Sequence, residues 1–271
     1  MPELPEVEVT RLGLRPFLNL TVSGLVIRNY SLRWPIDSEL PKILKNQILL
    51  DLTRRGKYIL AKFTSGTLII HLGMSGRLCI VSSEETLNKH DHVDIKFKEN
   101  NLILRYRDPR RFGSILWTDK DPLKHKLIKN LGPEPLNEEF DAKYLFSRLR
   151  NKEQCIKNTI MDSHIVVGVG NIYASEALYY AGIRPQRRSK KVSMREADSL
   201  VKAIKNVIKE AIRKGGSTMS DFFDVNGKNG YFQNEHRVYG RENNACVQCQ
   251  FLITQIKLGQ RSSFYCKKCQ K

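Results

Sequence analysis

Two Cys-x-x-Cys pairs near the C-terminus constrain the fold of this chain more than any other feature. The pairs are Cys246 with Cys249 and Cys266 with Cys269, separated by 16 residues, and they hold four of the six cysteines. Without an export signal, this spacing is typical of a tetrahedral Cys₄ zinc site, and the interval suits a β-hairpin that brings two turns together. We predict one structural Zn²⁺ per chain, because four thiolates leave no position open for water. Two surface redox pairs are the alternative.

The charge balance indicates a polyanionic partner. The 271 residues include 46 Lys and Arg against 28 Asp and Glu, a net charge of +18 at pH 7. Each Lys or Arg that neutralises a phosphate releases condensed counterions, so nucleic acid is the expected partner. No apolar run approaches the roughly 18 residues that span a membrane, and acids follow Met1 where a signal peptide needs positive charge. We therefore expect a cytoplasmic monomer with no membrane contact.

The first part of the chain reads as a helix followed by strands. Residues 2–20 place apolar side chains at helical positions, although Gly13 and Pro16 weaken the second half. From 21 to 118 the pattern changes to short apolar and β-branched runs divided by Gly, Asn and Asp, with strict alternation over 92–97. Such spacing predicts an antiparallel sandwich or a barrel-like pair of sheets.

The second part of the chain reads as helices. The segment 131–135 holds a glycine and two prolines and marks the predicted domain boundary. Residues 137–150 and 194–214 carry apolar side chains at helical spacing. Ser193 and Glu196 form a predicted capping box at the start of the second of these helices.

Three loops have residue types that suit nucleic acid. The Val-Gly-Val-Gly-Asn-Ile run at 167–172 opens a helix and could present backbone N–H groups to a phosphate. The Asp-Pro-Arg-Arg-Phe-Gly run at 108–113 sets an aromatic ring beside two guanidinium groups, as in side chains that wedge into a base stack. Residues 72–76 present a methionine between glycines. Taken singly, each segment also suits an ordinary packing turn, and the Lys-His-Asp-His run at 89–92 suits a surface turn.

The N-terminus could supply a nucleophile. Met1 precedes Pro2, a context in which the initiator methionine is normally removed, which would expose a secondary amine on Pro2. An α-amino group has a pKa near 8, so part of it is neutral at pH 7 and could attack a sugar C1′ to form an iminium. Glu3 could transfer the proton. A proline-bounded helix start is the structural alternative.

These motifs together resemble the formamidopyrimidine-DNA glycosylase family, the bacterial repair enzymes for 8-oxoguanine. The resemblance covers the whole chain, and its motifs occur in the expected order. They are the segments at 2–8, 55–58, 71–76, 89–92, 108–113, 131–135, 168–173 and 264–266, together with the Cys₄ cluster.

The resemblance implies an α+β fold in three parts. A catalytic β-sandwich with a flanking helix spans residues 2–131. A helix–two-turns–helix DNA-binding domain spans 136–225, and a zinc-finger β-hairpin spans 237–271. Residues 217–231 would form a loop that closes over a flipped base.

The resemblance also implies a bifunctional glycosylase and AP lyase of base excision repair. The Pro2 amine would displace the oxidised purine and form a Schiff base, with Glu3 assisting by proton transfer. Successive β- and δ-elimination would then cut the strand on both sides of the lesion. Lys57 matches the proton donor of β-elimination, and Arg261 matches the arginine assigned to δ-elimination.

The expected DNA contacts follow in the same way, with duplex DNA holding oxidised purines or abasic sites as the partner. Three residues match those that fill the hole left by the everted nucleotide, and four match positions that contact the DNA backbone. The first set is Met74, Arg110 and Phe112, and the second is His90, Lys152, Lys157 and Asn171.

Two other functions remain open from the sequence. An endonuclease VIII-like glycosylase for oxidised pyrimidines would share the amine chemistry and the zinc hairpin. A non-enzymatic zinc-finger protein would bind DNA without cutting it and would tolerate loss of Pro2.

Overall fold

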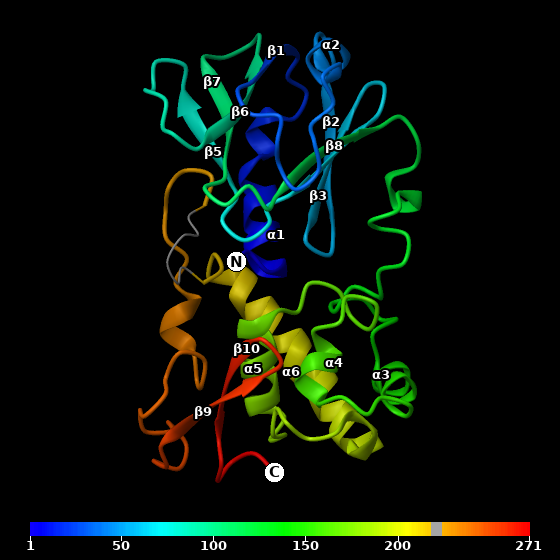
Figure 1. Cartoon of the computed structure of the whole chain (residues 1–271), viewed down its shortest axis with the longest axis vertical. Helices are drawn as coiled ribbons and strands as arrows, with labels where there is room; N and C mark the ends of the chain where they lie inside the picture. Colours follow the sequence, from blue (N-terminus) through cyan, green and yellow to red (C-terminus); the bar gives the residue numbers. More distant parts are fainter. Residues whose placement is uncertain (218–223) are drawn as a thin grey trace. The chain divides into compact units, whose positions relative to one another are not determined.

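The chain divides into two compact units. The computed structural model describes residues 1–217 and 224–271 (Figure 1). Unit 1 comprises Met1–Lys129 and Gly215–Tyr231, and unit 2 comprises Asn130–Lys214 and Phe232–Lys271. Part of the loop predicted at 217–231 lies outside the described residues. Among those described, no helix is both long and apolar enough to cross a membrane.

Unit 1 begins with helix α1 (Leu4–Gly13), which is shorter than the predicted 2–20. Glu3 caps it: the Glu3 N–H donates to Glu6 Oε2 at 2.8 Å, and the Glu3 side chain receives the backbone N–H of Glu6 in return. A short 3₁₀ turn (Arg15–Phe17) follows, in keeping with the fixed φ of Pro16.

Two four-stranded antiparallel sheets form the body of unit 1. Their strand orders are β1-β6-β7-β5 and β2-β3-β4-β8 (Figure 1). The strands are β1 (Val22–Ile27), β2 (Leu49–Arg55), β3 (Tyr58–Phe63), β4 (Thr67–His71), β5 (Arg77–Ser82), β6 (Asp91–Phe97), β7 (Leu102–Arg107) and β8 (Ser114–Thr118). A short helix α2 (Leu40–Leu44) and a 3₁₀ turn (Pro122–Lys124) complete the unit's regular elements.

One apolar core joins both sheets to α1. Val7 of α1 belongs to the same buried cluster as Ile95 of the first sheet and Ile59 of the second. The chain changes sheet three times, from β1 to β2, from β4 to β5 and from β7 to β8. The predicted sandwich is therefore confirmed, and the connections 72–76 and 108–113 are the two short crossover loops.

Unit 2 is built on helices and one hairpin. Its helices are α3 (Ala142–Leu149), α4 (Ile156–Ile160), α5 (Asn171–Tyr180) and α6 (Met194–Arg213), with 3₁₀ turns at Ser189–Lys191 and Phe232–Glu235. The hairpin pairs β9 (Ile253–Leu258) with β10 (Arg261–Cys266).

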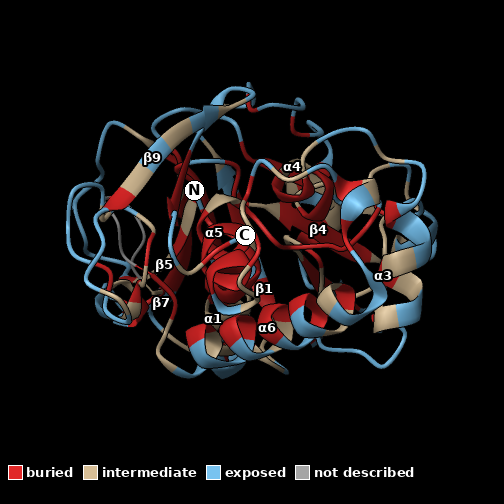
Figure 2. Cartoon of the chain, turned by 90° about the horizontal axis from the view of Figure 1, so that it is seen from below, coloured by how far each residue is buried: buried red, intermediate tan, exposed pale blue. Residues whose placement is uncertain are grey.

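Helix α6 confirms the strongest helix prediction. The Ser193 side chain accepts the backbone N–H of Glu196 and the Glu196 side chain accepts the N–H of Ser193, which completes the capping box. Figure 2 shows alternating buried and exposed faces along α6, as its apolar stripe requires. Eight of its residues are buried.

The segment after α6 belongs to unit 1, unlike the predicted 136–225 domain. The backbone N–H of Ser217 donates to Glu6 Oε1 at 2.8 Å, and the N–H of Ile80 donates to the carbonyl of Val225 at 2.8 Å. A Cβ on Gly13 would lie 2.4 Å from Val225 Cγ2, so the glycine is needed for this close approach. These contacts attach Ser217 and Val225 to α1 and strand β5.

Aromatic rings connect the hairpin to the 3₁₀ turn in unit 2. Tyr173, Phe232, His236, Tyr239 and Phe264 contact one another in that order, with neighbouring ring centroids 5.2–5.7 Å apart. Burial lowers the pKa of His236 to about 4, although a hydrogen bond to the Tyr239 backbone opposes the shift. The neutral imidazole is therefore part of the packed interior at neutral pH.

His236 should make the fold sensitive to acid. The unfolded chain takes up a proton near pH 6.5, so stability that is full above this pH is lost as the pH falls toward 4. Wild type should lose about 2 kcal/mol more than His236→Gln between pH 7.5 and pH 5, because glutamine does not titrate. Urea unfolding at the two pH values measures the difference. An equal loss of unfolding free energy in wild type and His236→Gln would refute the prediction.

Candidate active site and nucleic-acid interface

The predicted nucleophile lies at the start of unit 1. Pro2 is buried, and Glu3 is only 2% exposed. The Glu6 carboxylate accepts the N–H of Glu3 through one oxygen and that of Ser217 through the other, so it holds both segments. A single buried acid therefore sets the position of the N-terminus.

The N-terminus borders a hollow that also contains the predicted DNA-inserting residues. This hollow has a volume of about 630 Å³, and Met1, Met74, Arg110 and Phe112 all contribute to its lining. Met74 is 37% exposed and Phe112 45% exposed, so both large apolar side chains are available to a partner. The Arg110 guanidinium lies over the Phe112 ring, 4.8 Å from its centroid. The structure thus brings these four positions together within one unit.

A buried aspartate is hydrogen-bonded to both short crossover loops. Asp108 is fully buried; its Oδ1 accepts the Ser75 hydroxyl at 2.7 Å, and its Oδ2 accepts the Gly113 N–H at 2.9 Å. Ser75 Oγ in turn accepts the N–H of Arg110 at 3.1 Å. A Cβ on Gly73, which has φ +65°, would lie 2.4 Å from the Phe112 carbonyl carbon. The loops bearing Met74 and Phe112 are therefore held against each other.

Replacing Asp108 with asparagine should disturb this connection. The amide can no longer accept at both positions, so a buried N–H or hydroxyl loses its acceptor, at about 1–3 kcal/mol of unfolding free energy. Affinity for lesion-containing duplex should fall as the two loops separate. Urea unfolding and fluorescence anisotropy measure the two effects. Asp119→Asn, at an exposed aspartate, is the matched control, and equal behaviour of the two variants would refute the role of Asp108.

Two residues of the hollow escaped the sequence analysis. Arg33 and His71 both line it. The Gly73 N–H donates to His71 Nδ1 at 3.0 Å, which leaves Nε2 as the ring's protonated nitrogen when the imidazole is neutral. Burial, followed by the positive charges of Lys57 and Arg33, lowers the pKa of His71 to about 4. The position of His71 within the 71–76 motif was the available signal.

Lys57 and His90 lie near the same loops. Lys57 occupies the tight turn between β2 and β3, after Gly56 at φ +57°, and is half-buried. The positive charge of Lys57 contributes to the lowered pKa of His71. His90 is half-buried, and its backbone carbonyl accepts the Asp108 N–H at 3.1 Å. Both predicted residues therefore belong to the surroundings of the crossover loops.

In unit 2 the start of strand β10 is hydrogen-bonded to helices α4 and α5. Lys157 is 1% exposed, and its ammonium donates to the Ser262 carbonyl at 3.1 Å and to Ser263 Oγ at 2.7 Å. Asn171, the first residue of α5, donates to the same carbonyl at 3.1 Å. Arg261 is exposed next to these residues in sequence. The predicted DNA-backbone contact Lys157 is thus hydrogen-bonded to strand β10, which begins at Arg261.

The start of α5 has the geometry expected of an anion site. Gly170 caps the helix in an extended conformation, and Gly168 has φ +81°, which favours glycine. Asn171 Oδ1 is buried and has no hydrogen-bond partner among the described residues, so a water or ligand donor is expected there.

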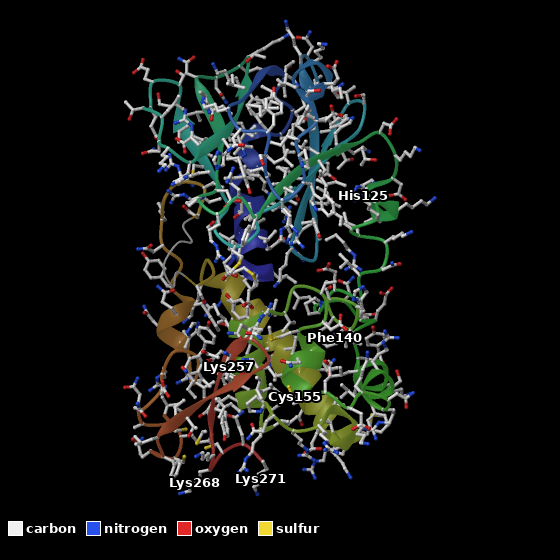
Figure 3. The ribbon with its side chains drawn as sticks, viewed as in Figure 1. His125, Phe140, Cys155, Lys257, Lys268 and Lys271 are labelled. Carbon is white, nitrogen blue, oxygen red and sulfur yellow. The ribbon has the colours of Figure 1, made fainter. Side chains whose placement is uncertain are left out.

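Three exposed lysines lie on the hairpin or shortly after it, Lys257 in β9 and Lys268 and Lys271 beyond β10. Lys152, before α4, is half-buried. Figure 3 labels Lys257, on strand β9, and Lys268 and Lys271 near the C-terminal end of the chain. This part of unit 2 therefore presents positive charge suited to phosphates.

Helix α5 also holds the segment before the hairpin. The buried Glu176 carboxylate accepts three consecutive backbone N–H groups, those of Arg237, Val238 and Tyr239, at 2.8–3.0 Å. Burial raises the pKa of Glu176, and the three amides oppose that shift. Sequence patterns did not reveal this residue, because its partners lie more than 60 positions away.

The four predicted cysteine ligands converge in unit 2. The Sγ atoms of Cys246, Cys249, Cys266 and Cys269 all lie within 4.8 Å of one another. Tetrahedral Zn–S bonds of about 2.3 Å would set the sulfurs about 3.8 Å apart. Two of the pairs measure 3.9 Å (Cys246–Cys269) and 3.5 Å (Cys249–Cys266), so the cluster could hold a metal ion.

Comparison with known proteins identifies the family to which this sequence is similar. The family model for the formamidopyrimidine-DNA glycosylase N-terminal domain matches residues 1–115, and that for the H2TH domain of the same glycosylases matches 131–223. The formamidopyrimidine-DNA glycosylase of Methylobacillus flagellatus is 51% identical over 100% of this chain and 97% of its own length. The corresponding protein of Saccharophagus degradans is 50% identical over the full length of both.

Solved structures agree. A mutant Lactococcus lactis FPG bound to DNA containing Fapy-dG matches with a TM-score of 0.93 and 31% identity over all of both chains. MutM bound to DNA containing carbocyclic 8-oxo-G matches with a TM-score of 0.91 and 31% identity over all of both chains.

The fold and site define a protein of the helix–two-turns–helix class, with an N-terminal β-sandwich and a Cys₄ hairpin. The chain belongs to the formamidopyrimidine-DNA glycosylase family. The family resemblance and the fold class predicted from the motifs are thereby confirmed.

Proposed function

We propose that this protein is a bifunctional DNA glycosylase and AP lyase of base excision repair that excises oxidised purines from duplex DNA. The observation that carries the proposal is the hollow of unit 1, where the N-terminus meets Met74, Arg110 and Phe112. A covalent nucleophile and the side chains that replace an everted base are needed at one place. Met1, directly before the proposed nucleophile Pro2, lines the hollow together with the side chains that would replace the base. The substrates named for the similar structures, Fapy-dG and 8-oxo-G, belong to the proposed class.

The proposed chemistry begins at Pro2 after Met1 is removed. The neutral secondary amine attacks C1′, the bond from C1′ to the base nitrogen breaks, and the base leaves with a proton. Ring opening gives an iminium between Pro2 and C1′, with Glu3 exchanging a proton with the sugar oxygen. Loss of a C2′ proton expels the 3′ phosphate, and subsequent loss of a C4′ proton expels the 5′ phosphate.

The remaining residues assist these steps. Lys57 transfers a proton in β-elimination, and Arg261 binds the phosphates and serves δ-elimination. Met74 and Phe112 enter the space of the everted nucleotide, while the Arg110 guanidinium hydrogen-bonds the orphaned base. His90, Lys152 and Asn171 meet the DNA backbone, and Lys157 supports the hairpin turn from within.

The thiolate cluster holds one structural Zn²⁺ per chain. The distances between its sulfurs fit one ion coordinated by all four cysteines, and four protein ligands leave no open coordination position. The ion would fix the hairpin that bears Arg261 and take no part in the bond-breaking steps. The protein acts as a monomer on DNA in the bacterial cytoplasm.

A strand-cleavage assay tests the proposed function. A 5′-labelled duplex with one 8-oxoguanine opposite cytosine should be cut at the lesion to leave a one-nucleotide gap with phosphates at both ends. A matched undamaged duplex should stay intact. Faster cutting of an oxidised-pyrimidine duplex would favour the endonuclease VIII-like alternative. Retarded mobility without product would favour the non-enzymatic binding protein.

A further inference from the structure

Tyr179 lies against the metal-ligand cluster, although it belongs to a different element. It is the ninth residue of α5, 7% exposed, and its hydroxyl oxygen is 3.4 Å from Cys246 Sγ. Cys246 itself is fully buried. The two residues are 67 positions apart and share one apolar cluster with Phe264 of the hairpin.

The direction of this hydrogen bond follows from the chemistry of a metal-bound cysteine. A thiolate has no proton to give, so the Tyr179 O–H must donate and the sulfur accept. Four thiolates around a dication carry a net charge of −2, which a buried site must compensate with hydrogen-bond donors. The backbone amides of Gln248 and Cys249 donate to the same sulfur from within the turn, whereas Tyr179 donates from a separate helix.

We infer that Tyr179 is a positioning residue for the metal, which stabilises the Cys246 thiolate and attaches the cysteine turn to helix α5. This inference rests on the proposal that the four thiolates hold zinc. Groups that hydrogen-bond a metal ligand commonly contribute about 10- to 100-fold to metal affinity, so Tyr179→Phe should lower zinc affinity about tenfold. The ring is retained, so the apolar packing around Phe264 is retained with it.

Tyr265→Phe is a matched control. Tyr265 is also buried, at 4% exposure, and lies directly beside the ligand Cys266. Its hydroxyl accepts a hydrogen bond from Gln186 at 3.3 Å. The control therefore removes a buried tyrosine hydroxyl at the same hairpin without removing the Tyr179 donor to Cys246.

Zinc transfer to a chromogenic chelator measures the effect on the full-length protein. We expect faster release and about tenfold weaker binding for Tyr179→Phe, with Tyr265→Phe close to wild type. In Co²⁺-loaded protein, the sulfur-to-cobalt charge-transfer band should shift only in Tyr179→Phe. Equal zinc affinity of Tyr179→Phe and wild type, or equal weakening in both variants, would overturn the inference.

Two further measurements separate the possible failures. Metal analysis of purified wild type tests the zinc proposal: protein without zinc would refute the site itself, whereas zinc-loaded protein indifferent to Tyr179→Phe would refute only the role of Tyr179. If the variant does not fold, wild type loaded with ¹¹³Cd decides. A slowly exchanging Tyr179 hydroxyl proton coupled to the metal would support the hydrogen bond, and a rapidly exchanging one would contradict it.

Discussion

Pro2→Gly should reduce excision by a factor on the order of 10³ or more, because it replaces the ring-held secondary amine with an unconstrained primary amine. Glycine also leaves the amine free to take many orientations, whereas the buried proline ring fixes it. DNA binding should change little, since the residues proposed to contact DNA are untouched. Borohydride trapping on an 8-oxoguanine duplex measures the covalent adduct, and anisotropy measures affinity.

Intact-mass measurement should first show that Met1 is absent from both wild type and Pro2→Gly. Pro35→Gly, at an exposed proline, controls for the general effect of a proline-to-glycine change. It should trap DNA as wild type does. A Pro2→Gly protein that lost binding and excision to the same extent would show that Pro2 is structural and that the nucleophile lies elsewhere.

Cys246→Ser should weaken DNA binding and excision together. Structural zinc contributes about 10 kcal/mol or more to the folding of small metal modules, so loss of one thiolate should release the ion and unfold the hairpin. Arg261 begins strand β10 of that hairpin, and the strand would lose its hydrogen bonds from Lys157 and Asn171. Metal analysis, thermal unfolding and the cleavage assay give three independent readouts.

Cys155→Ser is the control for the cysteine change, because Cys155 lies outside the four-sulfur cluster. It should keep its metal and its activity. Prolonged chelation of wild type should reproduce the Cys246→Ser defects, and readdition of Zn²⁺ should reverse them. Full activity of metal-free protein would contradict a structural role for the cluster.

The features that sequence revealed are those with local physical signatures. The Cys-x-x-Cys spacing predicted the cluster because each pair is confined to one turn, and Ser193 with Glu196 predicted the start of α6 because a capping box spans four residues. The glycines before Asn171 predicted a helix start for the same reason. The motif order then identified the family, which no single motif could do.

The features that sequence missed depend on contacts between distant segments. Glu6 is a helix acid in the sequence, yet its second oxygen binds Ser217, and Glu176 accepts amides from a segment more than 60 residues later. Neither contact has a periodicity or a fixed spacing. The same reason applies to Val225, which the family resemblance placed at the end of the 136–225 domain but which contacts strand β5 in unit 1.

The Asp108 connection has a mechanical consequence. The loops that bear Met74 and Phe112 are the two short connections by which the chain passes between the sheets, and Asp108 is hydrogen-bonded to both. Unstacking a base step costs a few kcal/mol, so a wedge that opens the step is pushed back by the duplex. Because Asp108 joins the two loops, the force that the duplex exerts on Met74 and Phe112 is transmitted to both four-stranded sheets and not to one loop alone. The β-sandwich thus gives rigid support to the Met74 and Phe112 side chains that would enter the DNA.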